Sequence, residues 1–268
     1  MDLGLDGARA VITGASRGVG RAIAETLLAE GAHVAICARG SSGRSDRTGV
    51  SAPTLDDVAA ELSAGGRVAT ATAVDVADHD ALAAWVGQVA DDWGGIDIVV
   101  SNASALGGVS RDNDGWRRNF EVDVLSATTV FDAALPHLQA SERSDFFQIA
   151  TITAVEYHGF PGGGLSYGAL KSALVNYVKQ LAIEYAADGI RANAVSPGPI
   201  FIEGGSWDFI QRHMPDYYAD NVARQPQGRL GQPEEVARVV AFLASSAASW
   251  VTGENVMIDG GFTKRIEY

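Results

Sequence analysis

The sequence predicts an α/β fold, a doubly wound parallel sheet of about seven strands with helices on both faces. Two observations predict it. Short apolar runs rich in β-branched residues alternate with longer helical patterns, and the first run leads into a glycine-rich turn, TGASRGVG, that opens a helix. In such sheets ligands bind at the carboxyl ends of the strands.

The predicted strands are short, apolar and bounded by polar or glycine residues. They cover residues 8–13, 33–38, 67–74, 96–101, 146–150, 190–195 and 255–259. The helical patterns between them cover 19–30, 54–64, 78–92, 114–138, 165–187 and 233–244. No repeat divides the chain, so we expect a single domain over 1–268, which is long enough to bury a large core.

Two segments interrupt this alternation. Residues 40–53 are polar and rich in Gly and Ser, which is typical of a loop. Residues 200–231 form a long excursion that carries five aromatic side chains. Its place after a strand's carboxyl end indicates either a substrate lid or a packed subdomain or subunit contact.

The composition excludes several classes of function. A net charge of -13 disfavours nucleic acid and anionic membranes as partners, because phosphate-rich surfaces require a basic footprint. Cys37 is the single cysteine, and the five histidines show no metal-binding spacing, so we expect neither a disulfide nor a metal site. The absence of a long apolar run or a basic leader predicts a cytoplasmic protein.

The glycine-rich turn predicts a dinucleotide site. Gly14, Gly18 and Gly20, with Ser16 between them, lie between the first strand and its helix. Glycines allow the backbone to turn tightly and approach a ligand, and the helix start offers unpaired N–H groups to a pyrophosphate.

Two arginines indicate which nicotinamide cofactor is used. Arg39 follows the second strand, where an acidic residue would bind a ribose 2′-hydroxyl, and Arg17 lies in the glycine-rich turn. Guanidinium groups pair with phosphate, so the two residues favour NADP(H), although each alone suits a solvated surface.

Two further strand ends face the same cleft. Asp75, followed by Val76, ends the third strand and is placed either to accept from an adenine amino group or to cap the next helix. Asn102 ends the fourth strand and is placed either to hold neighbouring backbone or to line the cofactor site.

A tyrosine and a lysine share one helical face in SYGALKSALVNYVKQLA. Tyr167 and Lys171 are four residues apart, so their side chains point the same way. Alone, such a pair is commonly surface decoration.

Together these motifs resemble the short-chain dehydrogenase/reductase family, and in particular its beta-ketoacyl reductase-like members. TGASRGVG resembles the family's TGxxxGxG, SNAS its NNAG and YGALK its YxxxK, while RANAVSPGPI and VTGENVMIDGG match its last two strands. The resemblance covers nearly the whole chain and implies a Rossmann-like fold and carbonyl or alcohol chemistry.

The resemblance implies that Tyr167 and Lys171 are catalytic and also contact the cofactor. A phenol with a pKa of about 10 is only about 0.1% ionised at pH 7, so it is a poor base unless its pKa falls. A neighbouring ammonium and an oxidised nicotinamide favour the phenolate, and in reduction the phenol donates its proton as hydride arrives.

Two family positions carry other residues here. Where the family has an asparagine, this chain has Asp123, which accepts hydrogen bonds and is expected to hold a water in a proton relay; Asn119 lies one helical turn away. The family's substrate-orienting serine corresponds to Thr151 when counted from Pro136, and to Thr153 or Ala154 when counted from Tyr167.

The turn after the sixth strand, SPGPIF, resembles the segment that holds the nicotinamide carboxamide. The resemblance assigns that contact to Pro197, Gly198 and Ile200, and Ile202 stands where the family often has threonine. One hydrogen bond to the cofactor is therefore expected to be missing.

The sequence thus predicts an NADP(H)-dependent oxidoreductase that interconverts a carbonyl and a secondary alcohol. A non-catalytic nucleotide sensor or scaffold, and an epimerase or eliminase, are the alternatives. The aromatic lid predicts a substrate larger and less polar than a small sugar, such as an acyl chain, a ring ketone or a polyketide. The resemblance also implies a homodimer or homotetramer formed through the long helices.

Overall fold

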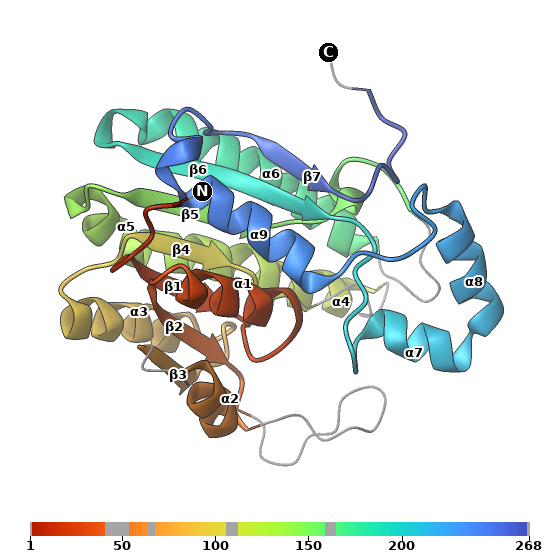
Figure 1. The fold of residues 1–268 in the computed structure, drawn as a ribbon, viewed down its shortest axis with the longest axis horizontal. Helices are drawn as coiled ribbons and strands as arrows, with labels where there is room; N and C mark the ends of the chain where they lie inside the picture. The colour runs from red at the N-terminus through yellow and green to blue at the C-terminus, as the bar shows by residue number, and fades with distance from the viewer. Residues whose placement is uncertain (1, 41–53, 64–67, 106–111, 159–164, 267–268) are drawn as a thin grey trace.

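The computed structural model describes residues 2–40, 54–63, 68–105, 112–158 and 165–266, and all statements below refer to these. One seven-stranded parallel sheet, in the order β3-β2-β1-β4-β5-β6-β7, forms the centre of the molecule (Figure 1). The strands are β1 (Arg9–Thr13), β2 (His33–Ala38), β3 (Ala69–Ala73), β4 (Ile98–Ser101), β5 (Ser144–Ile149), β6 (Ile190–Pro197) and β7 (Asn255–Ile258). The strand order reverses between β1 and β4, and such a point opens a crevice at the carboxyl ends.

Helices cover both faces of the sheet. They are α1 (Gly18–Ala29), α2 (Leu55–Leu62), α3 (His79–Trp93), α4 (Asn113–Asn119), α5 (Ser126–Ala140), α6 (Ser166–Glu184), α7 (Ser206–His213), α8 (Pro215–Arg224) and α9 (Pro233–Ala244). Short turns of helix are η2 (Ile152–Ala154), η3 (Ala186–Asp188) and η4 (Ser246–Ala248). α1 and α9 lie together on one face, and α3, α5 and α6 cover the other (Figure 1).

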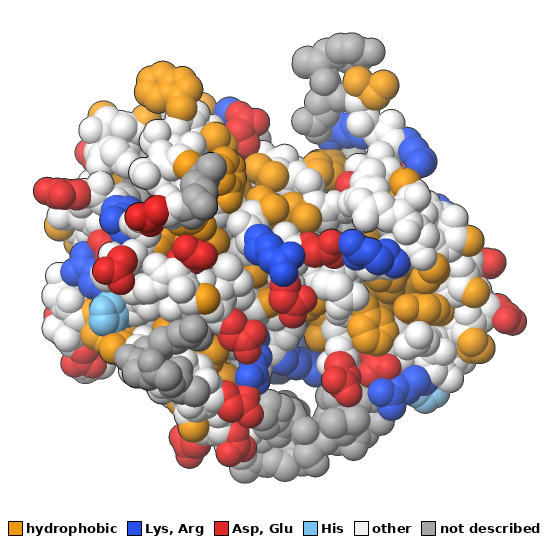
Figure 2. All heavy atoms as spheres, viewed as in Figure 1, with side chains coloured by type: hydrophobic (Ala, Val, Ile, Leu, Met, Phe, Trp, Pro, Cys, Tyr) orange, Lys and Arg blue, Asp and Glu red, His pale blue; other side chains and the backbone are white. Residues whose placement is uncertain are grey.

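The surface shown in Figure 2 carries charges of both signs. Acidic and basic side chains lie interspersed between apolar patches on this face rather than gathered by sign. No helix among the described residues is both long enough and apolar enough to cross a bilayer.

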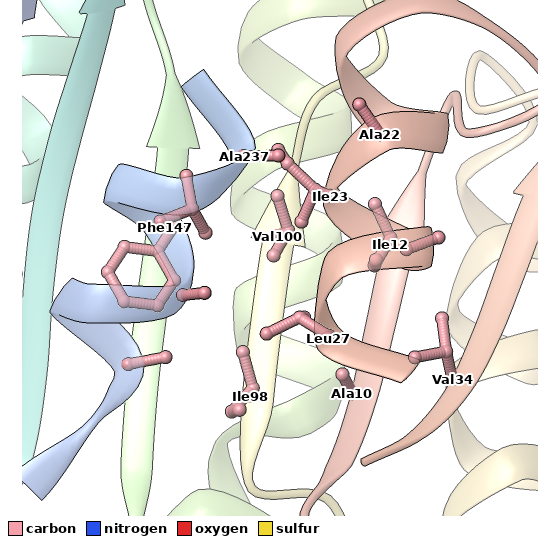
Figure 3. Close-up of a cluster of buried hydrophobic side chains, with 14 of the residues drawn as sticks. Ala10, Ile12, Ala22, Ile23, Leu27, Val34, Ile98, Val100, Phe147 and Ala237 are labelled. Atoms are coloured by element: carbon pink, nitrogen blue, oxygen red, sulfur yellow. The ribbon is translucent and has the colours of Figure 1, made fainter. Parts of the chain in front are cut away.

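The core consists of two apolar layers, one on each face of the sheet, because successive side chains of a strand point to opposite faces. Ile12 of β1 belongs to the layer under α1 and α9, whereas its neighbour Val11 belongs to the layer under α3, α5 and α6. Figure 3 shows Ile23 and Leu27 of α1 directed at the sheet beside Val100. Burial of each such side chain contributes about 1.5–3 kcal/mol, which fixes the sheet that carries the site.

The seven strands and the doubly wound class are confirmed, and two predicted elements differ in detail. The single helix predicted over 114–138 is interrupted by a π-helix, η1 (Phe120–Leu125), between α4 and α5. The excursion 200–231 contains α7 and α8, which lie beyond the carboxyl ends of β6 and β7 (Figure 1). Most of the predicted loop 40–53 lies outside the described residues.

Candidate active site

The glycine-rich turn is a tight crossing of backbone segments. Gly14 has φ +67, and a Cβ there would lie 2.7 Å from the Cα of Ala103. Gly18 has φ +61 and begins α1, whose first turn has neither a side-chain cap nor an acidic residue. The start of α1 therefore keeps its N–H groups free of side-chain partners, as anion binding requires.

Asn102 holds this turn in place. Its Nδ2 donates to the carbonyls of Thr13 and Gly14 at 2.9 and 3.0 Å, and its backbone N–H donates to the Thr13 hydroxyl at 3.0 Å. A Cβ on Gly20 would overlap the same amide. Of the two roles predicted for Asn102, the structure shows the structural one, which ties the end of β4 to the turn after β1.

The two arginines predicted to favour NADP(H) lie after β2 and in the turn after β1. Arg39 is exposed, and no described residue pairs with its guanidinium. Arg17 instead donates from Nη1 to the carbonyl of Gly204 at 3.3 Å, so it contacts the segment 200–231. Ser16, between Gly14 and Arg17, is partly buried in the turn.

Asp75 does not cap the helix that follows it. Its carboxylate accepts from the N–H of Ala77 at 3.1 Å, and the cap of α3 is Asp78. The Asp75 carboxylate remains exposed beside the buried Val76, which leaves it accessible to a ligand at the end of β3.

The turn after β6 packs as closely as the one after β1. A Cβ on Gly198 would lie 2.7 Å from the Cβ of Asp259, and Pro197 ends the strand. Ile200 is buried, and its backbone pairs with Gly231. Ile202 lies against Gly18, because a Cβ at Gly18 would be 2.9 Å from its Cδ1.

The predicted catalytic groups come together beyond the end of β5. The Lys171 Nζ lies 5.9 Å from the centroid of the Tyr167 ring and donates to the carbonyl of Ile149 at 2.9 Å. The Tyr167 hydroxyl is hydrogen-bonded to the side chain of Thr151. Thr153 donates from its hydroxyl to Thr151 at 3.2 Å, so Thr151 is the threonine that reaches the phenol.

Asp123 lies at the centre of η1 and pairs with the lysine. Its Oδ1 is 3.2 Å from the Lys171 Nζ, and its Oδ2 accepts from the backbone N–H of Ala105 and the amide of Asn119, both at 3.1 Å. Asp123 and Lys171 are each 1% exposed, so this ion pair is removed from solvent. π-Helical turns of this kind are frequent at functional sites.

Burial and a neighbouring carboxylate dominate the electrostatics of Tyr167. Burial raises the pKa of the Tyr167 phenol above its usual range, the charge of Asp123 raises this pKa further, and the Thr151 hydrogen bond lowers it. A lysine alone would favour the phenolate, but Asp123 balances that ammonium at close range. In the protein alone these groups hold the phenol protonated, whereas the expectation of a lowered pKa included an oxidised nicotinamide beside it.

The segment 200–231 has its own aromatic cluster. The rings of Trp207 and Tyr217 are stacked with centroids 6.5 Å apart, and Tyr218 meets Trp207 edge to face at 6.4 Å. Asp208 accepts from the N–H of Gly204 at 2.8 Å and closes the turn before α7. The segment is thus a folded helical pair that touches the glycine-rich turn through Arg17 and Ile202.

Sequence reasoning gave no role to two polar residues of the site, Asn119 and Ser166. Asn119 is fully buried and Ser166 donates to its Oδ1 at 3.0 Å, which connects α6 to Asp123 through the amide. The four-residue spacing of Asn119 and Asp123 was the available signal, but Ser166 lies 47 positions away along the chain. Among the described residues, no group of His, Cys, Asp and Glu is arranged to hold a metal ion.

Comparison with known proteins decides the family. The family model described as enoyl-(acyl carrier protein) reductase matches residues 14–263. The chain is a short-chain dehydrogenase/reductase. This short-chain dehydrogenase/reductase is 35% identical to the Escherichia coli 3-oxoacyl-[acyl-carrier-protein] reductase FabG over 266 residues, which are 97% of this chain and 98% of that protein.

Two other relatives differ in what they act on. Isoepoxydon dehydrogenase patN of Penicillium expansum is 35% identical over 259 residues, which cover 96% of this chain and 95% of that protein. The solved structure of L-sorbose reductase from Gluconobacter frateurii, a complex with NADPH and L-sorbose, superimposes with a TM-score of 0.86 at 30% identity, covering 99% of this chain and 100% of that one. These similarities show that this short-chain dehydrogenase/reductase belongs to a family of oxidoreductases.

Proposed function

We propose that the protein reduces a ketone to a secondary alcohol with NADPH, Tyr167 being the proton donor. The observation that carries this proposal is the cluster of Tyr167, Thr151 and Lys171 beyond the carboxyl end of β5, in the sheet whose β1 leads into the glycine-rich turn. A phenol held protonated suits the donation of a proton to a carbonyl oxygen.

The residues around the glycine-rich turn fit a nicotinamide dinucleotide. The free N–H groups at the start of α1 and the close approach at Gly14 suit the pyrophosphate, while Arg39 and Asp75 are accessible for the adenosine end. We assign the nicotinamide side to Pro197, Gly198 and Ile200. When bound, the reduced cofactor supplies a hydride to the carbonyl carbon.

The protein's own residues carry the proton. Thr151 orients the carbonyl oxygen by donating a hydrogen bond to it, and Tyr167 transfers its phenolic proton to the same oxygen. Hydride on carbon and proton on oxygen together convert the ketone to the alcohol. Lys171 binds the ribose of the cofactor. Its ammonium also contributes to the balance of charge around the Tyr167 phenol. A proton relay through Asp123 and water remains part of the proposal.

We infer a substrate larger than a simple sugar, a ring ketone being the first candidate. The aromatic cluster of Trp207, Tyr217 and Tyr218 supports an apolar ligand. One relative, a cis-4-hydroxycyclohexanecarboxylate dehydrogenase from Sinomonas cyclohexanicum that is 35% identical over 258 residues, is named for a cyclohexane substrate.

The experiment is a panel of carbonyl compounds assayed for loss of NADPH absorbance, with NADH in parallel. The panel contains substituted cyclohexanones, 3-oxoacyl thioesters and keto-sugars. We expect turnover of a cyclic ketone with NADPH preferred. Cofactor binding without turnover of any compound would favour the sensor or scaffold, and product formation without net cofactor oxidation would favour an epimerase or eliminase.

We also propose a homodimer or homotetramer. Large apolar side chains are exposed on helices and turns, with Ile183 of α6 at 70%, Phe120 of η1 at 44% and Trp250 at 98%. Exposed large apolar side chains favour self-association where they gather into one patch. Light scattering at micromolar concentration is expected to give two or four times the chain mass, and a monomer at every concentration would contradict the proposal.

A further inference from the structure

A buried chain of hydrogen bonds connects the helix of Tyr167 to Asp123. The Ser166 hydroxyl donates to Asn119 Oδ1 at 3.0 Å, and Asn119 Nδ2 donates to Asp123 Oδ2 at 3.1 Å. Ser166, Asn119 and Asp123 are each at most 1% exposed. Ser166 directly precedes Tyr167, so this chain fixes the start of α6 relative to η1.

Every neighbour that the structure gives Asp123 is a donor. Its Oδ2 receives the Ala105 N–H and the Asn119 amide, and its Oδ1 faces the Lys171 ammonium at 3.2 Å. A neutral carboxyl would need an acceptor for its own proton, and an ionised carboxylate is acceptor only. The surroundings of Asp123 therefore suit the charged form.

The balance of charge around the phenol follows from this arrangement. Among the described residues, the groups that face Tyr167 are Lys171 from its own helix, Asp123 from η1 and the neutral Thr151 hydroxyl from the end of β5. An asparagine at 123 would leave the ammonium as the single charge, which favours the phenolate. With Asp123 the pair is neutral overall, so the Thr151 hydrogen bond is the contact left to stabilise a phenolate, and it offsets only part of the burial.

We propose that Asp123 is a positioning residue whose carboxylate, oriented by Asn119, neutralises Lys171 and so keeps Tyr167 protonated and ready to donate to a carbonyl at alkaline pH. This inference rests on the proposed function and adds to it a reason for the reductive direction. Asp123 does not alter the overall equilibrium of the reaction; it sets the pH range in which the phenol holds its proton.

The test compares two variants of nearly equal shape. Asp123→Asn removes the charge and retains the volume. The swap Asn119→Asp with Asp123→Asn retains one carboxylate and one amide in the same buried space, but moves the charge one helical turn away from Lys171. A role in packing or folding alone predicts that the swap behaves like the wild type.

The first measurement is the pH profile of kcat/KM for ketone reduction with NADPH, on the best compound of the panel. The alkaline limb of the profile is the pH range in which kcat/KM falls as pH rises. In both variants we expect this limb to lie about one pH unit or more below that of the wild type. An unmoved limb in Asp123→Asn, or a wild-type profile in the swap, would overturn the proposal.

The second measurement needs neither substrate nor cofactor. The 13Cζ signal of Tyr167, assigned by its loss in Tyr167→Phe, is followed by NMR while the pH is raised. We expect the wild-type signal to stay unshifted through the range where a free tyrosine ionises, near pH 10, and the Asp123→Asn signal to titrate at least about one unit earlier. Equal titration in both proteins would refute the charge effect.

Failure of the proposed function and failure of this inference give different results. If no ketone is reduced by the wild type, the proposed function fails while the NMR titration still decides whether Asp123 controls the phenol. If ketones are reduced and Tyr167→Phe is inactive but the profiles of wild type and Asp123→Asn coincide, the proposed function stands and this inference fails.

Discussion

At the scale of single residues, the site depends on where a few charges lie. Arg39 is exposed at the end of β2 with its guanidinium unpaired among the described residues, whereas Arg17 is engaged with the carbonyl of Gly204. The two arginines look equivalent in the sequence, but their guanidinium groups have different contacts. Arg39 is the one available to a 2′-phosphate without breaking a contact.

Arg39→Ala tests this assignment. A hydrogen bond to a charged group contributes about 1.5–3 kcal/mol, so we expect KM for NADPH to rise about 10- to 100-fold while KM for NADH stays unchanged. Steady-state kinetics with both cofactors measures it, and Arg39→Lys serves as the control that keeps the charge. Equal loss with both cofactors would show that Arg39 does not read the phosphate.

At the scale of elements, the turn between β1 and α1 combines left-handed backbone with close packing. Gly14 has φ +67 and lies against the backbone of Ala103, so a methyl group there is strained and overlaps its neighbour. Gly87, inside α3, has ordinary helical backbone and nothing within 4 Å of an added Cβ. The same substitution therefore has opposite effects at the two positions.

We expect Gly14→Ala to lower the free energy of unfolding by about 2–4 kcal/mol and to weaken cofactor binding, because the turn must open. Gly87→Ala is expected to raise the free energy of unfolding by up to about 1 kcal/mol, since alanine favours the helix. Urea denaturation and cofactor titration measure both variants. If Gly14→Ala were as stable as Gly87→Ala, the crossing at Ala103 would not be as tight as described.

Periodicity in the sequence identified most elements because each depends on local pattern. Strand side chains alternate between the two core layers, as Val11 and Ile12 do, and that alternation is visible in the sequence. The π-helix around Asp123 was not predictable, because hydrogen bonds from Ala105 and Asn119 and an ion pair to Lys171 accompany it, and Lys171 lies 48 positions away along the chain. Likewise, spacing placed Tyr167 beside Lys171, but the charge balance depends on tertiary contacts.

At the scale of the whole molecule, two buried carboxylates give stability opposite dependences on pH. Burial raises the pKa of Asp145 to about 7, and the ion pair with Arg191 offsets only part of this effect. Burial alone would also raise the pKa of Asp97, but hydrogen bonds from Arg9 and Ser141 outweigh it and hold that pKa below its usual value.

The sign of the pH dependence that Asp145 gives to stability follows from proton binding. Between about pH 4 and pH 7 the folded state retains the Asp145 proton that the unfolded chain loses, so stability falls as pH rises through this range. A shift of about three units corresponds to about 4 kcal/mol. We expect Asp145→Asn to abolish this decline in urea denaturation measured from pH 4 to 8.

Asp97→Asn is the matched control with the opposite sign. The stability that ionised Asp97 contributes is present above its unfolded pKa of about 3.9 and is lost as pH falls through its lower folded pKa. The variant should therefore be less stable than the wild type at neutral pH, with the difference shrinking in acid. A parallel pH dependence for Asp145→Asn and wild type would contradict the account of Asp145.

The central claim is that the Tyr167 hydroxyl delivers the proton to the substrate's carbonyl. The most direct measurement compares wild type and Tyr167→Phe in single-turnover reduction with NADPH, with cofactor affinity followed by fluorescence. We predict that hydride transfer slows by about 10²- to 10⁴-fold while the cofactor dissociation constant stays within a factor of about three. Reduction at the wild-type rate in Tyr167→Phe would contradict the claim.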